Sequence, residues 1–248
     1  MFTHLNLAIP LRDRLIVALD FPSASQAKQL VELLGEEVSF YKVGLELFMT
    51  GDYFSLLDWL NERGKKVFAD LKLYDIPATV ERAIRALSRT PARFATVHGD
   101  LAIMEAAACG KGDNLQVLAV TVLTSLDDNS LKEMGYAEDI SSLVLKRAKQ
   151  AQRAGLDGVI ASGLEAGLIR KEIGGEFLII TPGIRSTVDE RADQKRIVTL
   201  EQAFQSGADY VVVGRPIRNA QNPKAAAHAL QRQIARLFAQ TCNALPGS

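Results

Sequence analysis

Apolar residues along this chain gather in short runs rich in β-branched side chains, and each run is followed by a longer segment in which apolar residues recur at helical spacing. Near the start, that spacing of i, i+3, i+4 and i+7 is met by Ala27, Leu30, Val31 and Leu34. The runs predict strands at Arg14–Asp20, Ser39–Leu45, Lys66–Lys72, Phe94–His98, Leu115–Leu123, Gly158–Ser162, Phe177–Thr181 and Tyr210–Gly214.

The regular alternation of strand and helix predicts one α/β domain, a (β/α)8 TIM barrel spanning residues 1–248. Strands covered by helices are apolar almost throughout, as the run from Tyr210 to Val213 is. A doubly wound open sheet is the alternative, but its first strand should lead into a glycine-rich turn, whereas Asp20-Phe-Pro-Ser follows here. The ends, at about 1–12 and 241–248, are expected to be loosely held.

Helix boundary signals agree with this alternation. Asn222 followed by Pro223 is typical of a helix start, because asparagine caps the free backbone N–H groups and proline suits the first helical position. Gly64 stands where a glycine would end the helix before the third strand.

Composition narrows the class of protein. The net charge is +0 and the charges are scattered, which argues against nucleic-acid or membrane-surface binding by bulk electrostatics. The longest apolar runs are of strand length, and the N-terminus lacks the pattern of a signal peptide. Because Cys109 and Cys242 are the only cysteines, a disulfide framework is not expected and a cytoplasmic location is the default expectation.

Polar residues recur where the predicted strands end. The carboxyl ends of barrel strands carry the functional groups of this fold, so these residues are the candidates for a site. One alone would mean little, since Lys42 could extend its ammonium to solvent and His98 could be a hydrogen-bonded structural histidine. The candidates in strand order are Asp20, Lys42, Asp70, Lys72, His98, Thr124, Arg185, Gly214 and Arg215.

The third strand carries the strongest signal. Asp70 and Lys72 are two residues apart, so their side chains share one side of the strand, and Asp75 follows where the chain turns toward a helix. A lone buried charge is costly, whereas an acid–base–acid set is mutually compensating and can hold a lysine protonated. A buried ion pair that only fixes the fold is the competing interpretation.

The loops after strands seven and eight are the usual phosphate site of this fold. Gly214 lets the backbone approach an anion closely, and Arg215 offers a two-pronged donor to phosphate oxygens. Arg185 and Gln194, in the long loop after strand seven, could contact the same group, although spacing alone describes them equally well as exposed loop residues.

Together these residues resemble the orotidine 5′-monophosphate decarboxylase family from Leu15 to about Arg218. The central motif is Asp-x-Lys-x-x-Asp, here Asp70 to Asp75, followed by Ile76 and Pro77. The loop that contains Gln194 is similar to the bacterial branch. Further matching pieces are Val17-Ala-Leu-Asp20, Tyr41-Lys42-Val-Gly, Leu123-Thr124-Ser, Thr181-Pro-Gly-Ile-Arg185 and Val213-Gly214-Arg215.

The resemblance implies decarboxylation of orotidine 5′-monophosphate (OMP) to UMP in pyrimidine biosynthesis, without a metal or organic cofactor. It assigns Lys72 to protonation of a C6 carbanion and Asp70 to the vicinity of the leaving carboxylate. The implied nucleotide contacts are Asp20 and Lys42 for the ribose, Thr124 for the pyrimidine edge, and Arg185, Gln194, Gly214 and Arg215 for the phosphate.

The family also implies a homodimer with shared active sites, in which Asp75, Ile76 and Thr79 reach into the neighbouring subunit's pocket.

Two other functions stay open. Magnesium-dependent relatives act on keto-hexulose phosphates and carry a carboxylate at the end of strand two, where this chain has Lys42. A non-catalytic phosphate-binding barrel is the other, although a pure binder has little reason to keep the charges of Asp70, Lys72 and Asp75.

Overall fold

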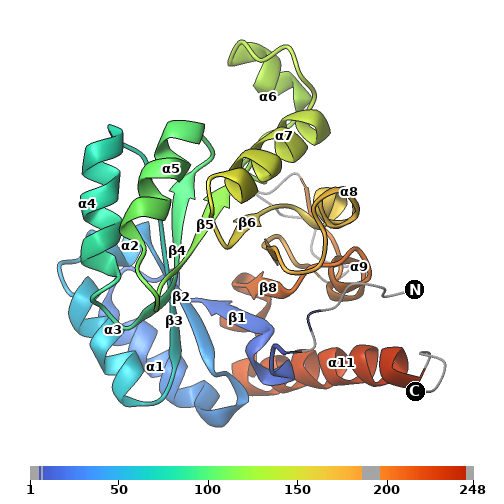
Figure 1. Ribbon diagram of the computed structural model, residues 1–248. Coiled ribbons are helices and arrows are strands. Elements are labelled where there is room, and N and C mark those ends of the chain that lie inside the picture. Colours follow the sequence, from blue (N-terminus) through green and yellow to red (C-terminus); the bar gives the residue numbers. More distant parts are fainter. Residues whose placement is uncertain (1–5, 7, 186–195, 244–248) are drawn as a thin grey trace.

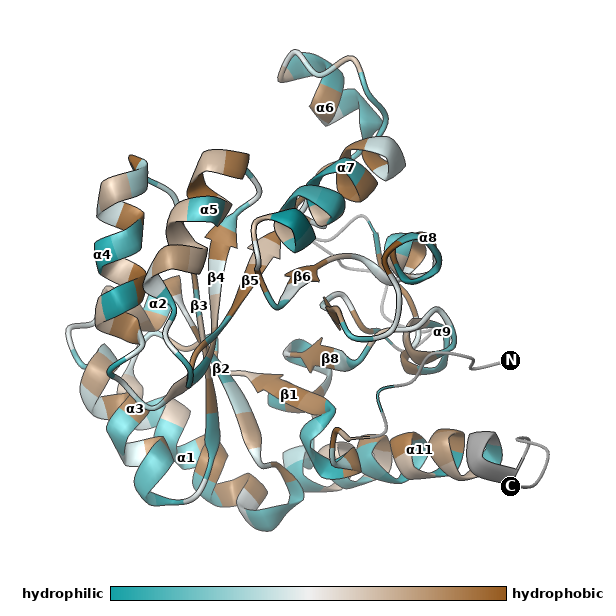
Figure 2. Cartoon of the chain, viewed as in Figure 1, coloured by the Kyte–Doolittle hydropathy of each residue, from teal (hydrophilic) through white to brown (hydrophobic). Residues whose placement is uncertain are grey.

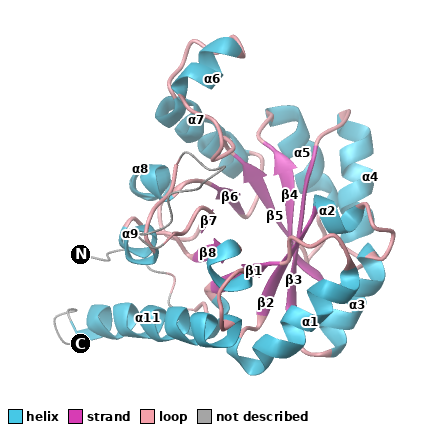
Figure 3. Ribbon diagram, turned by 180° about the vertical axis from the view of Figure 1, so that it is seen from behind, coloured by secondary structure: helices cyan, strands magenta, loops and turns pink. Residues whose placement is uncertain are grey.

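The computed structural model describes residues 6, 8–185 and 196–243. Within them, eight parallel strands form a closed barrel in chain order, with β8 pairing back onto β1. Helices surround this barrel, and the strands converge at its centre (Figure 1; Figure 3). The strands are β1 (Leu15–Ala18), β2 (Phe40–Gly44), β3 (Lys66–Leu73), β4 (Ala92–His98), β5 (Gln116–Val120), β6 (Gly158–Ile160), β7 (Leu178–Thr181) and β8 (Tyr210–Val213).

The predicted fold class is confirmed, and each predicted strand overlaps an observed one. The fifth differs most, because β5 ends at Val120 while the apolar run continues to Leu123. The extra apolar residues Val122 and Leu123 lie in the loop that lines the barrel mouth, so their hydropathy reflects that position.

The helices follow the strands in the expected order. They are α1 (Ala24–Leu34), α2 (Leu45–Phe48), α3 (Tyr53–Glu62), α4 (Pro77–Leu87), α5 (Leu101–Gly110), α6 (Asp128–Glu133), α7 (Ile140–Arg153), α8 (Gly163–Ile173), α9 (Leu200–Gln205), α10 (Arg215–Arg218) and α11 (Pro223–Asn243), with 3-10 turns at Leu11–Asp13 and Gly35–Glu37.

Both expected helix boundary signals are found. The Asn222 side chain accepts a hydrogen bond from the backbone N–H of Ala225 at 3.0 Å, as a capping residue does. Gly64 follows α3 with a φ of +67°, the left-handed conformation that favours glycine. Among the described residues, no helix is long and apolar enough to span a bilayer.

Alternation along the strands creates two apolar layers. Leu15 and Val17 face the helices, whereas Ile16 and Ala18 face the barrel interior. Strands are accordingly hydrophobic on both sides, while polar residues are concentrated on the outer faces of the helices (Figure 2). The interior layer consists of Ile9, Ile16, Ala18, Phe40, Phe68, Phe94, Leu118, Leu178, Ile180, Tyr210 and Val212.

Ile9 lies within the segment expected to be loosely held, yet it is buried in the barrel interior layer. Leu11–Asp13 forms a 3-10 turn, and buried Asp13 pairs with Lys66 at 2.6 Å. Ile9 and Asp13 are therefore packed on the barrel, whereas residues 10–12 between them are exposed. At the other end α11 continues to Asn243, and residues 244–248 lie outside the described part of the chain.

Candidate active site

A cavity of about 680 Å³ opens at the carboxyl end of the barrel. Its walls come from strand ends and the loops that follow them, so residues far apart in the sequence meet there. They are Ala18, Asp20, Lys42, Glu46, Phe68, Asp70, Lys72, Val120, Val122, Leu123, Thr124, Ser125, Ile160, Ala161, Pro182, Gly183, Arg185, Val212, Gly214, Arg215 and Arg218.

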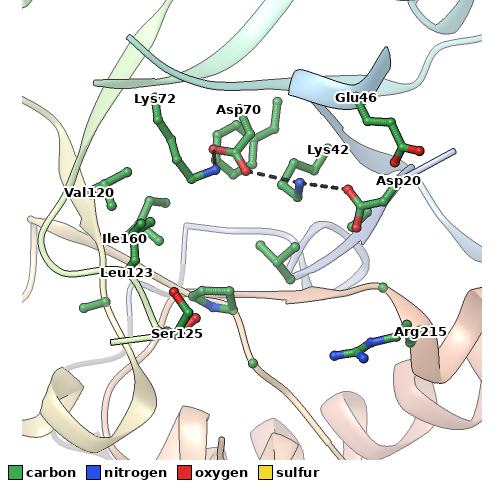
Figure 4. Close-up of a pocket in the computed structure, with 18 of the residues that line it drawn as sticks. Asp20, Lys42, Glu46, Asp70, Lys72, Val120, Leu123, Ser125, Ile160 and Arg215 are labelled. Carbon is green, nitrogen blue, oxygen red and sulfur yellow. Dashed lines mark hydrogen bonds and ion pairs between the residues drawn. The ribbon is translucent and has the colours of Figure 1, made fainter. Parts of the chain in front are cut away.

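Four charged side chains form a row along one wall, which we call the charge row: Asp20, Lys42, Asp70 and Lys72 (Figure 4). The Lys42 Nζ lies 3.3 Å from Asp20 Oδ1 and 3.1 Å from Asp70 Oδ2. The Lys72 Nζ lies 2.8 Å from Asp70 Oδ1. Signs therefore alternate along the row, and Lys72 stands at its end.

Burial and neighbouring charges set the protonation of the central pair. Burial raises the pKa of the Asp70 carboxyl, but Lys42 and Lys72 outweigh burial and bring it to about 2. Burial also lowers the pKa of the Lys42 ammonium, yet Asp70 and Asp20 outweigh it and raise the pKa above its ordinary value. Both groups are consequently ionised at neutral pH.

The backbone at Lys72 is unusual. Its φ is +49°, the only positive value at a non-glycine residue among the described ones. The pairing of β3 with β4 also shifts register between Ala69 and Leu73. A left-handed conformation costs a residue with a Cβ roughly 1–2 kcal/mol, so this site stores strain at the residue that presents an ammonium to the cavity.

Thr96 on β4 supports this geometry, and sequence reasoning did not identify it. Its hydroxyl accepts a hydrogen bond from the Lys72 backbone N–H and donates one to Asp70 Oδ1, each at 2.9 Å. Thr96 is fully buried. A threonine inside a strand carries no sequence signal for such a role.

Three arginines also line the cavity. Arg185 follows β7, and Arg215 begins α10 directly after Gly214. Arg218 lies one helical turn further on and donates a hydrogen bond to the backbone carbonyl of Asp20. Figure 4 shows Arg215 across the cavity from Asp70 and Lys72, whereas Arg218 contacts Asp20 at one end of the charge row.

Thr124 lines the cavity between Leu123 and Ser125, as its position after the fifth strand predicted. Gln194 lies outside the described residues. His98 does not belong to the cavity wall; its ring contacts that of Tyr74 in a tilted arrangement, with centroids 4.5 Å apart.

Asp75, Ile76 and Thr79 are not brought to the cavity of their own chain. Asp75 is exposed and accepts a hydrogen bond from the Ile76 backbone N–H at 2.6 Å, rather than pairing with Lys72. Ile76 is 66% exposed, and Thr79 lies on the first turn of α4.

Three further polar residues of the cavity wall were not predicted from the sequence: Glu46, Ser125 and Arg218. Ser125 adjoins a predicted residue, and Arg218 stands three positions after Arg215, on the same face of a helix. Glu46 is the second residue of α2, just past β2, where a charged residue is not distinctive.

Residues 13–230 match the model of the orotidine 5′-phosphate decarboxylase / HUMPS family. The chain belongs to this family. A relative from Methylococcus capsulatus, named orotidine 5′-phosphate decarboxylase, is 58% identical over 94% of this chain and 97% of its own length. A relative of the same name from Xylella fastidiosa is 48% identical over 94% of this chain and 96% of its own length.

Solved structures agree with the family assignment. The orotidine 5′-phosphate decarboxylase from Lactobacillus acidophilus superposes with a TM-score of 0.78 at 35% identity, covering 90% of this chain and 99% of that one. The enzyme of the same name from Pyrococcus horikoshii OT3 gives 0.72 at 27% identity, with coverage of 89% and 99%. The resemblance inferred from the motifs is confirmed.

Proposed function

We propose that this chain is an orotidine 5′-phosphate decarboxylase that converts OMP to UMP and CO2, the last step of de novo pyrimidine biosynthesis. The observation that carries the proposal is the charge row, which ends in the Lys72 ammonium at the cavity. The substrate is inferred from relatives at 48–58% identity, which are named orotidine 5′-phosphate decarboxylase. A cytoplasmic location is consistent with this pathway and is part of the proposal.

In the proposed reaction, the bond between C6 and its carboxylate breaks, CO2 leaves and the electron pair stays on C6. Lys72 then donates a proton to C6, which gives UMP, and the neutral amine regains a proton from solvent. An ammonium fixed beside the developing carbanion also stabilises its charge electrostatically. Asp70 supports both steps because it holds Lys72 at 2.8 Å.

Asp70 accepts bonds from Lys42, Lys72 and Thr96, which favours a role in supporting the charge row. Repulsion between Asp70 and the substrate carboxylate is a second contribution open to this residue. We assign the ribose hydroxyls to Asp20 and Lys42, at the other end of the row.

Thr124 is assigned to the pyrimidine edge, and the phosphate to Arg185, Gln194, Gly214 and Arg215. An arginine pair suits a dianion because a guanidinium can donate two parallel hydrogen bonds. Energy from the remote phosphate can organise the site where the chemistry occurs, so a substrate without phosphate should lose rate as well as affinity.

We further propose a homodimer in which Asp75, Ile76 and Thr79 complete the partner's pocket. The support is that these residues are not brought to their own cavity, although two of them are exposed beside the strand that carries Lys72. In the dimer, the Asp75 carboxylate would face the Lys72 ammonium of the other chain.

The magnesium-dependent activity on keto-hexulose phosphates is the competing function within the same family. Lys42 argues against it, because its ammonium already occupies the space between the carboxylates of Asp20 and Asp70. A metal ion there would have to compete with a covalently tethered cation. A non-catalytic phosphate-binding barrel would leave the strained backbone of Lys72 without a purpose.

The test is to mix the purified protein with OMP, with and without EDTA, and to follow loss of substrate absorbance together with UMP formation. We expect equal initial rates in both samples, since protein side chains supply the cations. Loss of turnover on adding EDTA, restored by magnesium, would reject this function in favour of the metal-dependent one.

A further inference from the structure

The chain passes through residues 196–198 between two loops of the cavity wall. On one side, the Val198 N–H donates to Gly183 and the Arg185 N–H donates to Val198, at 3.2 and 3.1 Å. On the other side, the Arg196 N–H donates to the carbonyl of Thr124 at 3.3 Å. This segment therefore joins the loop after β7, which carries Arg185, to the loop after β5, which carries Thr124.

The Arg196 side chain strengthens the second connection. Its Nη2 donates to the carbonyls of Val122 and Leu123 at 2.9 and 3.1 Å, and both residues line the cavity. Its Nη1 lies 2.9 Å from Glu165 Oε2 on α8. One planar guanidinium thus spans a carboxylate and two consecutive carbonyls, which a lysine ammonium cannot reproduce.

Arg196 and Glu165 are both buried, with exposed fractions of 7% and 4%. The pair is near the cavity but is not part of its wall, and neither residue touches the charge row. Removing either charge would leave the other buried and unpaired, which is costly. Glu165 therefore keeps Arg196 in place, and the bonds from Arg196 to Val122 and Leu123 hold the loop after β5 in one position.

We propose that Arg196, held by Glu165, is a positioning residue that fixes the distance between the pyrimidine side of the cavity at Thr124 and the phosphate side at Arg185. The inference rests on the proposed function, because it requires one substrate that contacts both sides. Its effect passes through backbone carbonyls, and Arg196 makes no contact with the reacting atoms.

The consequence depends on the length of the substrate. OMP would use both sides at once, so a shift of one side against the other misplaces the reacting C6. A misplacement of about 1 Å can cost roughly 10²-fold in rate. Orotidine lacks the phosphate and contacts only the pyrimidine side. It can therefore still bind correctly when the two sides are displaced relative to each other.

The experiment compares kcat/KM for OMP and for orotidine, the latter at high enzyme concentration, in wild type, Arg196→Lys and Arg196→Met. We expect the ratio of OMP to orotidine activity to fall roughly 10-fold or more in Arg196→Met, mainly through kcat for OMP. The ratio for Arg196→Lys should lie between those of wild type and Arg196→Met, because lysine keeps a charge opposite Glu165 but cannot bond both carbonyls.

Arg170→Lys is the matched control. Arg170 is also a buried arginine with a carboxylate partner, Asp209 at 2.6 Å, and it donates to the carbonyls of Phe177 and Gly207. These partners precede β7 and β8, at the end of the barrel away from the cavity. Its replacement should lower thermal stability and leave the ratio unchanged.

An equal fall with both substrates in the Arg196 variants would overturn the proposal, as would an equal change of the ratio in Arg170→Lys. If Arg196→Met fails to fold, Arg196→Lys and Glu165→Gln still decide, since each must shift the ratio in the same direction. A failure of the proposed function would be distinguishable, because wild type itself would then not turn over OMP.

Discussion

At the scale of single residues, the site depends on charges that stabilise one another inside a protein wall. Asp70 is the centre, with Lys42 on one oxygen and Lys72 on the other. An isolated carboxylate so buried would tend to take up a proton, but here the two ammonium groups keep it ionised. We therefore expect the ionised form of Asp70 to contribute to folding as well as to the proposed chemistry.

Asp70→Asn should reveal that contribution through pH. The pKa of Asp70 is lowered to about 2 from its ordinary value near 4, so its stabilising effect is present above pH 4 and is lost as the pH falls toward 2. We expect the free energy of unfolding of wild type to exceed that of the variant most at pH 5–6, and the gap to shrink by about 2 kcal/mol on acidification.

Urea unfolding of both proteins between pH 6 and pH 2 measures the gap. A difference that stays constant over this range would mean that the Asp70 charge does not contribute to folding in this way.

Some of these residues could be predicted from sequence, and the reason is spacing. Asp70 and Lys72 are separated by one residue on a strand, which placed them together, and the contact is found. The positive φ of Lys72 and the support from Thr96 could not be predicted, because both depend on how β3 pairs with β4. Arg196 gave no signal either, since its partners are distant in sequence.

At the scale of elements, the strands place the charge row, while loops and a short helix place the cations opposite. Continuous apolar runs located every strand of the described residues, because parallel strands covered by helices are apolar throughout. It extended the fifth strand too far, since the wall of a nucleotide-sized cavity also needs apolar residues such as Val122 and Leu123. The start of α10 at Arg215 follows from Gly214 and Pro216.

Arg215→Ala tests the assignment of α10 to the phosphate. We expect a higher KM and a lower kcat for OMP, since an arginine that binds a dianion contributes to transition-state stabilisation as well as to affinity. Steady-state kinetics with orotidine should give nearly the same kcat/KM for wild type and variant. A large difference between the two proteins on orotidine would show that Arg215 acts on something other than phosphate.

At the scale of the whole molecule, Lys72, the last residue of the charge row, lies close to the exposed loop that contains Asp75. Tyr74 and Ile76, on either side of Asp75, are 63% and 66% exposed, so two large apolar side chains flank Asp75 at the surface. A second copy that covers this loop would bury them and bring Asp75 to a neighbouring cavity. This is the basis of the proposed shared active site.

Mixed dimers test that arrangement. Lys72→Ala and Asp75→Asn should each be inactive alone. After subunit exchange at equal concentrations, about half the dimers are mixed, and one pocket of each mixed dimer carries both intact residues. Roughly a quarter of wild-type activity should return, by the symmetry of a twofold dimer. If activity stays at the level of the separate variants despite demonstrated exchange, Asp75 acts within its own chain.

The most direct test of the account is a comparison of turnover and product binding in Lys72→Ala. We predict that kcat for OMP falls by at least roughly 10³-fold, because the variant lacks both the proton donor and the cation beside C6. UMP affinity, measured by calorimetry, should change far less, since the cations on the phosphate side remain. Substantial OMP turnover by Lys72→Ala, or a collapse of UMP binding with turnover retained, would contradict the role given to Lys72.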